Sequence, residues 1–408
     1  MQGRGQPHFY ISPHTNRGKS SVGFLLLSLV AASLAGLISQ LRAFELKSIR
    51  PSSGDIQVSG DKTLGTPTLW FACDGATSDL ERMLSQTGVI SDLQTLKEGV
   101  SLSLSELSEG RAQIILKLNQ AEIPVTAWLS LPGEEGYYLN ASNAQAAMAR
   151  FKEFERWTAT YGLRWASIGL DIEPNIQDFE AFGKGHKWHI VLVIIGRYFN
   201  TGRIKRAKKS YAELIREMHR NGYTVETYQY PFIADERRVH ATLLERISGI
   251  VDIRADREAL MLYTSFNPRL DSALIWVYGP EAQAIAVGST TGSDADPRFR
   301  PLNWEEFSRD LLVARHFSSI IGVYSLQGCI QQGFLARLKT MNWDQSVAIP
   351  ADAVQKAERL RGRIQRVIWI GSRLPYAATV ILALLVPWLG AVLRRRKMIV
   401  HFSGSRAF

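Results

Sequence analysis

The segment SIGLDIEP, residues 167–174, determines the fold assignment and contains the candidate chemistry. Its apolar residues alternate with small or acidic ones, and a period of two is typical of a β-strand with two different faces. One face carries Ile168, Leu170 and Ile172. The other carries Ser167, Gly169, Asp171 and Glu173. Both carboxylates therefore lie on the same face at the end of the strand, where Pro174 stops it.

On both sides of this segment, short apolar runs alternate with helical patterns, which is typical of βα units around a parallel sheet. We expect further strands at Thr68–Asp74, Pro124–Leu131, Gly222–Tyr230, Ala259–Ser265, Gln283–Ser289 and Ser319–Leu326. Gln113–Leu118 is an eighth strand or part of a helix. The clearest helical patterns are Asn143–Tyr161, Ile204–Arg220, Asp235–Ile247 and Trp304–His316. No glycine-rich phosphate-binding turn follows the first strand, so the sequence favours a single α/β domain, a (β/α)8 TIM-like barrel, over a doubly wound sheet.

In such a barrel Asp171 and Glu173 point inward at the C-terminal end of a strand, where barrel enzymes place their chemistry. Two acids about 7 Å apart along one strand face cannot both ionise freely, so one should keep a raised pKa. We expect Glu173, nearest the mouth, to be a general acid/base and Asp171 to tune or orient it. The alternative is a pair of acids satisfied by buried Arg or Tyr side chains.

Other expected strands carry residues that fit a saccharide site, because aromatic rings stack on sugars while acids and hydroxyls bind their oxygens. Each aromatic residue alone could equally belong to the core. We expect Tyr263 to be a catalytic residue together with Glu173 and Asp171, flanking the substrate. The expected substrate-binding set comprises Glu226, Tyr228, Tyr230, Trp128, Asp74, Met261 and Tyr324.

The same residues carry a family resemblance. SIGLDIEP resembles the end of the DxxDxDxE strand of family 18 glycoside hydrolases, the chitinase-like barrels, with Asp171 at the last Asp and Glu173 at the acid. Met261 and Tyr263 resemble that family's Met-x-Tyr strand, whose Tyr assists a substrate-assisted reaction. Ala166 and Gly169 stand where the first two Asp residues would be. The strand end is also similar to family 25 lysozyme-like barrels. The resemblance implies a glycosidase-like barrel.

The formal charge of +10 comes from the two ends of the chain, because residues 51–354 carry a net charge of −5. This distribution argues against nucleic-acid binding and for a membrane. Residues 22–41 and 374–393 are uncharged, apolar and each twenty residues long, as a spanning helix requires. The first run could instead be a signal peptide cleaved near Ser33 and Ala35.

The expected organisation has seven parts: a basic tail (1–21), an anchor or signal segment (22–41), a linker (42–66), the barrel (67–345), a basic juxtamembrane segment (346–373), a transmembrane helix (374–393) and a basic tail (394–408). We expect a protein that spans the membrane twice, or once if the first segment is cleaved, with its barrel outside the cytoplasm. The basic juxtamembrane segment would lie near the lipid headgroups or be an ordinary solvated helix.

Two cysteines are too few for a disulfide scaffold, but Cys73 and Cys329 fall near strands that barrel closure brings together. They form a disulfide or remain reduced in the core. The histidines show no metal-ligand spacing, and we expect no cofactor. The sequence thus predicts a membrane-anchored glycoside hydrolase acting on a polysaccharide or peptidoglycan. The alternative is an inactive glycan-binding barrel or membrane scaffold. No pattern specifies the oligomeric state.

Overall fold

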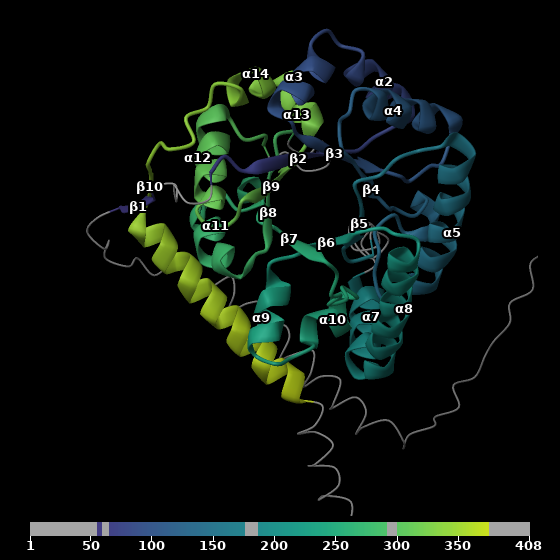
Figure 1. Ribbon diagram of the computed structural model, residues 1–408. Helices are drawn as coiled ribbons and strands as arrows, with labels where there is room; N and C mark the ends of the chain where they lie inside the picture. The colour runs from purple at the N-terminus through teal and green to yellow at the C-terminus, as the bar shows by residue number, and fades with distance from the viewer. Residues whose placement is uncertain (1–54, 59–64, 176–186, 292–299, 375–408) are drawn as a thin grey trace, which may run out of the picture. The chain divides into compact units, whose positions relative to one another are not determined.

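The computed structural model describes residues 55–58, 65–175, 187–291 and 300–374, and these contain an eight-stranded closed barrel (Figure 1). Every pair of neighbouring strands is parallel, and β9 pairs with β2 to close the ring. The expected TIM-like barrel is confirmed. The strands are β2 (Thr68–Cys73), β3 (Gly99–Ser103), β4 (Val125–Trp128), β5 (Ser167–Ile172), β6 (Val225–Gln229), β7 (Arg257–Met261), β8 (Ala284–Gly288) and β9 (Ile320–Tyr324).

Six of these strands fall within the expected runs, and β7 overlaps its expected run, Ala259–Ser265, but begins two residues earlier. The remaining strand was not expected. It is β3, and Gln113–Leu118 lies inside helix α4 (Glu109–Gln120). The Ser108 side chain caps this helix by accepting a hydrogen bond from the backbone N–H of Arg111 at 3.2 Å. Ile114, Ile115 and Leu118 then lie on the buried face at helical spacing. The apolar run is therefore a helix face and not a strand.

Helices surround the barrel and cover the outward faces of its strands (Figure 1). The longer helices are α2 (Thr77–Leu84), α3 (Val89–Leu96), α4, α5 (Ala144–Tyr161), α7 (Lys187–Phe199), α8 (Thr201–Arg220) and α12 (Trp304–Arg315). The shorter ones are η3 (Gly133–Glu135), α9 (Phe232–Arg238), α10 (Leu243–Ser248), η4 (Thr264–Phe266), α11 (Ala273–Tyr278), η5 (Gly279–Glu281), α13 (Leu326–Gln331) and α14 (Phe334–Leu338).

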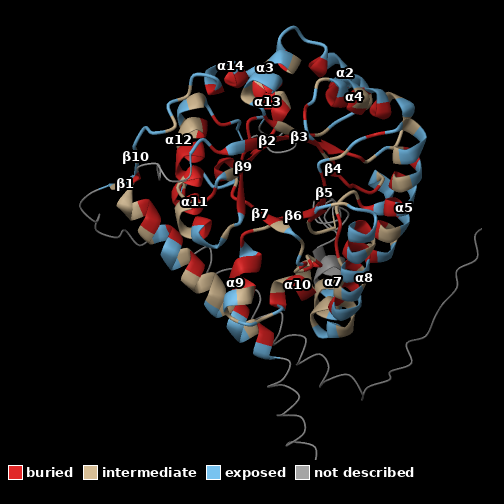
Figure 2. Cartoon of the chain, viewed as in Figure 1, coloured by how far each residue is buried: buried red, intermediate tan, exposed pale blue. Residues whose placement is uncertain are grey.

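The alternation along each strand produces two separate cores. Ile168, Leu170 and Ile172 of β5 pack outward with the helices in the large hydrophobic core. A smaller cluster inside the barrel contains Trp128, Tyr228 and Met261. Both faces of the strands are therefore buried, as Figure 2 shows for the ring of strands. The expected assignment of the two faces of β5 is confirmed.

The chain continues to pack on the barrel beyond its last strand. β10 (Val347–Ile349) pairs antiparallel with β1 (Ile56–Val58), and a helix over residues 351–374 follows. Arg361 in this helix is buried and donates from Nε to Oδ1 of the buried Asp235 of α9 at 2.7 Å. Its guanidinium also lies 4.3 Å from the centre of the Tyr278 ring. This ion pair fixes the basic helix to the side of the barrel.

Among the described residues, no helix combines the length and apolarity needed to cross a bilayer. The two expected spans, 22–41 and 374–393, fall outside these residues except for Leu374. Of the two alternatives for Cys73 and Cys329, a disulfide or two reduced core thiols, the structure has the second, because both are free and buried. Cys329 lies in α13 and its Sγ contacts Oγ1 of Thr290 at 3.9 Å, while Cys73 is buried at the end of β2.

Candidate active site

A pocket opens at the C-terminal end of the barrel strands. The cavity encloses about 130 Å³. A cavity of similar size, about 150 Å³, holds benzene in another protein, so this one has room for one six-membered ring. Aromatic and small apolar side chains from six strands and their following loops form most of its wall. The lining comprises Trp70, Ala72, Trp128, Tyr138, Asp171, Glu173, Tyr228, Tyr230, Met261, Tyr263, Phe266, Ala286 and Tyr324.

Asp171 and Glu173 are held in place by the segment that follows β4. The backbone N–H of Leu139 donates to the carbonyl of Asp171 at 3.0 Å, and the N–H of Glu173 donates to the carbonyl of Leu139 at 3.1 Å. Leu139 thus extends the sheet by one bridge beyond the regular part of β5. These bonds keep the chain extended up to Glu173, so the two acids stay on the inward face.

Both carboxyl groups have raised pKa values. Burial raises the pKa of Asp171 well above its ordinary value, and the negative charges of Glu173 and Asp74 raise it further. Burial also raises the pKa of Glu173 to about 7, although a hydrogen bond from Tyr230 opposes the shift. Two interacting acids of this kind titrate as a pair and retain a shared proton near neutral pH. The site can therefore both give and take a proton.

Two tyrosine contacts shape the mouth around Glu173. The Tyr230 hydroxyl donates to Oε2 of Glu173 at 2.9 Å. Across the pocket, the rings of Tyr263 and Tyr324 stack with their centres 5.7 Å apart. Burial raises the pKa of both tyrosines, and the negative charges of Asp171 and Glu173 contribute, so their hydroxyls stay protonated at neutral pH. They present O–H groups to anything that enters the pocket.

The floor of the pocket is an aromatic stack that depends on two glycines. The rings of Trp70 and Tyr228 stack at 5.1 Å, and the Tyr228 hydroxyl lies 2.9 Å from Oγ of Ser101. A Cβ atom on Gly169 would come within 2.5 Å of the Tyr228 hydroxyl, and one on Gly322 would meet the Trp70 ring. A side chain at residue 169 would therefore require Tyr228 to move.

Nε1 of Trp70 is buried in the pocket wall without a hydrogen-bond partner in the described structure. Nε1 of Trp128 and Oδ1 of Asp171 are buried there as well, and a hydrogen bond from Trp128 lowers the pKa of Asp171 against the effect of burial. Unpartnered buried polar groups cost free energy, which a bound polar molecule can recover. The wall thus offers the N–H donor of Trp70 and the carboxyl group of Asp171 among aromatic rings. This combination suits a ligand that has both apolar faces and hydroxyl groups, such as a sugar.

The structure brings together most of the residues expected at the site, but it places two of them elsewhere. Glu226 lies near the start of β6, level with Gly169, and forms an ion pair with Arg257. It also accepts a hydrogen bond from Oγ of Ser167 at 2.7 Å. Asp74 follows β2 and lines a neighbouring cavity. Neither carboxylate lines the pocket, although Asp74 influences it through its charge.

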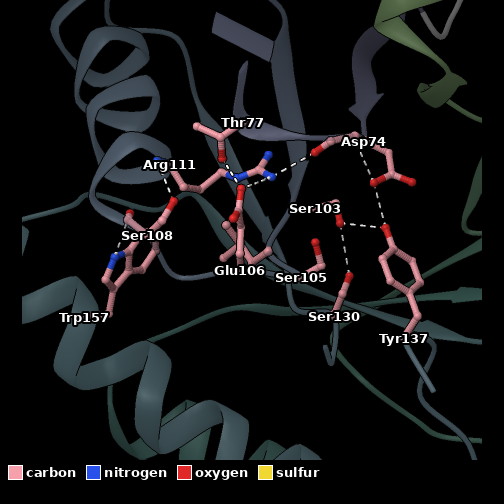
Figure 3. Close-up of polar contacts among 12 residues, drawn as sticks. Asp74, Thr77, Ser103, Ser105, Glu106, Ser108, Arg111, Ser130, Tyr137 and Trp157 are labelled. Atoms are coloured by element: carbon pink, nitrogen blue, oxygen red, sulfur yellow. Dashed lines mark hydrogen bonds and ion pairs between the residues drawn. The ribbon is translucent and has the colours of Figure 1, made fainter. Parts of the chain in front are cut away.

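Sequence reasoning missed the residues that connect Asp74 to the pocket. The Tyr137 hydroxyl donates to Oδ1 of Asp74 at 2.7 Å and also lies 2.7 Å from Oγ of Ser103, which is near Ser130 (Figure 3). Tyr138 lines the pocket beside Tyr137. The detectable signal was a pair of adjacent tyrosines in the connection between β4 and α5. Ser103 lies on β3, the strand that the sequence did not reveal.

The described residues include no group of three or more His, Cys, Asp or Glu side chains that could hold a metal ion. The pocket also lacks a glycine-rich phosphate cradle. What the site provides is a pair of interacting carboxyl groups, tyrosine hydroxyls and an aromatic wall. These groups suit acid/base chemistry on a neutral polar molecule.

No protein-family model matches the sequence, and no curated protein matches it. The fold resembles several solved barrels at low identity. The glycoside hydrolase domain of PgaB (BpsB) from Bordetella bronchiseptica is 11% identical, over 67% of this chain and 98% of that one, with a TM-score of 0.42. A xylose isomerase domain protein from Planctomyces limnophilus is 12% identical over 67% and 96%, with a TM-score of 0.38. Saccharomyces cerevisiae Gas2p, in complex with laminaritetraose and laminaripentaose, is 11% identical over 74% and 70%, with a TM-score of 0.36.

Proposed function

We propose that this protein is a glycoside hydrolase whose general acid/base is Glu173. The observation that carries the proposal is the Asp171–Glu173 pair, which lines an aromatic pocket at the C-terminal end of β5 with both pKa values raised. Glycoside cleavage requires a carboxylic acid that is still protonated near neutral pH, so that it can protonate the leaving oxygen. A pKa of about 7 suits Glu173 to that role.

The other pocket residues have distinct roles in this proposal. Asp171 is more deeply buried than Glu173. Its charge state, protonated or ionised, affects how strongly Glu173 binds its own proton, so the two carboxyl groups together determine the proton affinity of the site. Tyr263 and Tyr324 present hydroxyls to the sugar. Trp128 and Trp70 offer ring faces, and Trp70 also offers a buried N–H group that has no partner in the described structure. A bound sugar ring would supply a hydrogen-bond partner to that group.

The proposed substrate is a polysaccharide or peptidoglycan outside the cytoplasm. The protein is proposed to be anchored in a membrane by its apolar segments. Support for the anchor comes from the uncharged runs at 22–41 and 374–393 and from the basic residues that flank them. The barrel would then lie on the extracytoplasmic side, attached at both ends of the chain or at one end if the first run is cleaved.

One observation favours a second candidate, a barrel that binds glycans without cleaving them. Gly169 leaves its motif position empty, and Tyr228 fills the space where a further acid would stand. Substrate-assisted attack in the manner of family 18 would lack that acid. In this alternative the aromatic floor and the raised pKa of Asp171 would serve recognition only.

An assay of the full chain in detergent or nanodiscs separates the two candidates. Chitin, peptidoglycan and β-glucan fragments would be tested for hydrolysis and for binding, with the native chain and with Glu173→Gln. Hydrolysis by the native chain that disappears in Glu173→Gln supports the enzyme. Binding that survives this substitution, with no hydrolysis by either protein, supports the binding barrel.

A further inference from the structure

The exposed large apolar side chains of the described structure gather at one end of the barrel. Two of them, Phe232 and Phe266, are 40% and 44% exposed and follow β6 and β7 directly. Both therefore lie at the end where the pocket opens, and Phe266 also lines the pocket. Soluble surfaces seldom expose several large apolar residues together, and such a grouping marks an interaction site.

Helix α7, which follows β5, adds to the same end. Leu192 and Phe199 are 58% and 54% exposed and are seven residues apart, so they share one helix face. Hydrogen bonds of Arg246 in α10 connect α7 to its neighbours. Its Nη1 donates to the carbonyl of Tyr198 in α7, and its own carbonyl accepts from Arg203.

Arg203 connects this group to the mouth of the barrel. Its Nη1 lies 3.2 Å from Oγ of Ser142, which immediately precedes α5 and therefore follows β4. The segment after β4 is at the C-terminal end of the strands, so the end of α7 is at that end too. The connections after β5, β6 and β7, which are neighbouring strands of the barrel, thus each present exposed apolar side chains.

The helix over residues 351–374 runs toward this end of the barrel from the opposite one. It begins after β10, close to Trp343, whose carbonyl accepts from Arg315 at the end of α12. Arg315 also donates to the carbonyl of Gly65, just before β2. The helix thus starts at the N-terminal end of the strands. Near its other end, the carbonyl of Gly371 accepts from the Tyr198 hydroxyl.

The last turns of this helix expose an apolar stripe that faces away from the barrel. Arg366, Trp369, Ile370, Arg373 and Leu374 are exposed at helical spacing, and the Arg373 guanidinium lies 4.1 Å from the centre of the Trp369 ring. Earlier in the helix the exposed positions are charged, at Lys356, Glu358 and Arg359. Aromatic and basic residues beside apolar ones are typical of a helix at a lipid headgroup layer.

Acidic and basic residues lie on different sides of the barrel mouth. The connections after β2, β3 and β4 carry exposed acids, namely Asp79, Glu106, Glu109 and Glu135, of which Asp79 pairs with Arg82 and Glu106 with Arg111. The apolar end of the helix carries Arg366 and Arg373. A negatively charged membrane surface would attract the second region and repel the first. The uncharged run 374–393 also begins where the exposed stripe ends.

We propose that the mouth of the barrel, on its β5–β7 side, docks on an anionic lipid bilayer through α7, Phe232, Phe266 and the last turns of the helix 351–374. This inference rests on the membrane anchor in the proposed function and adds the orientation of the barrel. The pocket then opens beside the bilayer. The saccharide that it reaches most readily is one attached to a lipid or lying at the membrane surface.

Spin labels on the full chain test this orientation in vesicles of phosphatidylglycerol and phosphatidylcholine. The labels would be attached at Ile370→Cys and Phe232→Cys. The control is Ser346→Cys, which is exposed beside β10 at the opposite end of the barrel. The unsubstituted chain checks that the buried thiols of Cys73 and Cys329 do not react. Collision rates with oxygen, which concentrates in lipid, and with a water-soluble nickel complex report where each label lies.

We expect the ratio of oxygen to nickel collisions to be several-fold higher at Ile370 and Phe232 than at Ser346. Arg366→Gln together with Arg373→Gln should reduce this difference in the anionic vesicles. If all three labels are equally aqueous while the protein resists extraction by alkaline carbonate, the chain is anchored but the proposed orientation is wrong. If carbonate releases the protein, the anchor is wrong as well. Neither outcome depends on hydrolysis.

Discussion

The Tyr230 hydroxyl donates a hydrogen bond to Oε2 of Glu173 at 2.9 Å, joining the ends of two neighbouring strands at the pocket mouth. This bond stabilises the charged carboxylate and so opposes the effect of burial on the Glu173 pKa. The proton affinity of the proposed acid is therefore set by two opposing influences, and one of them can be removed by a single substitution.

Tyr230→Phe should raise the pKa of Glu173 above about 7, because only burial and neighbouring charge then act on it. If Glu173 must be protonated for the rate-limiting step, the alkaline limb of the pH profile of kcat/KM moves to higher pH. Tyr324→Phe is the control, since its hydroxyl has no hydrogen bond to Glu173 and its loss should leave the limb in place. An unshifted limb in Tyr230→Phe would separate Glu173 from the observed ionisation.

Gly169→Ala should destabilise the fold, because its Cβ would meet the Tyr228 ring in the floor of the pocket. Overpacking of this kind costs about 1–3 kcal/mol. Thermal unfolding of the full chain would measure the loss. Gly362→Ala is the matched control, since nothing lies within 4 Å of that position in the helix 351–374 and alanine is the better helix former. Equal stability of the two variants would contradict the close packing of Tyr228 on Gly169.

Arg361→Ala should release the helix 351–374 from the barrel, because it leaves the buried Asp235 without its charged partner. Breaking a buried ion pair from one side costs on the order of 3–5 kcal/mol. Hydrogen exchange should show faster exchange across this helix. Arg359→Ala, whose guanidinium contacts only Gln355 of the same exposed turn, should leave exchange nearly unchanged. Unchanged protection in Arg361→Ala would mean that other contacts hold the helix.

Glu98→Gln should stabilise the protein at high pH and have little effect at low pH. Burial raises the pKa of Glu98 to about 8, while a hydrogen bond from the Leu69 N–H opposes the rise. The unfolded chain ionises this group near pH 4.5, so the native protein loses stability as the pH rises from there to about 8. The loss is on the order of a few kcal/mol. Denaturation at pH 4 and pH 9 would measure it, and equal differences at both would refute the account.

The strands that the sequence revealed are those with apolar or aromatic alternation, such as β5. The strand it missed, β3, reads GVSLS and contains two serines. Ser101 and Ser103 are buried because Tyr228 and Tyr137 supply their hydrogen-bond partners from other parts of the chain. A single sequence does not show such distant hydrogen-bond partners. The serines therefore gave this segment no apolar pattern by which a buried strand could be predicted.

The alternation along a strand predicts which side chains point into the barrel, but it does not predict how far each one lies from the mouth. A period of two puts Glu226 and Tyr228 on the same face of β6, and Tyr230 follows the last residue of that strand. The pairing of Glu226 with Gly169 sets it deeper than Glu173, where Arg257 neutralises it. This stagger between strands follows from barrel closure and is not encoded in either strand alone. The same limit explains why Asp74 was expected in the substrate-binding set and lies in the neighbouring cavity.

The rate of glycosidic bond cleavage by Glu173→Gln tests the central claim most directly. The measurement is the release of new reducing ends from the best substrate of the panel, by the full chain in nanodiscs. Loss of a general acid lowers the rate by about 10²–10⁴-fold. Glu135→Gln, which removes an exposed acid outside the pocket, should cleave at the native rate. Cleavage by Glu173→Gln at the rate of Glu135→Gln would contradict the assignment of Glu173 as the catalytic acid.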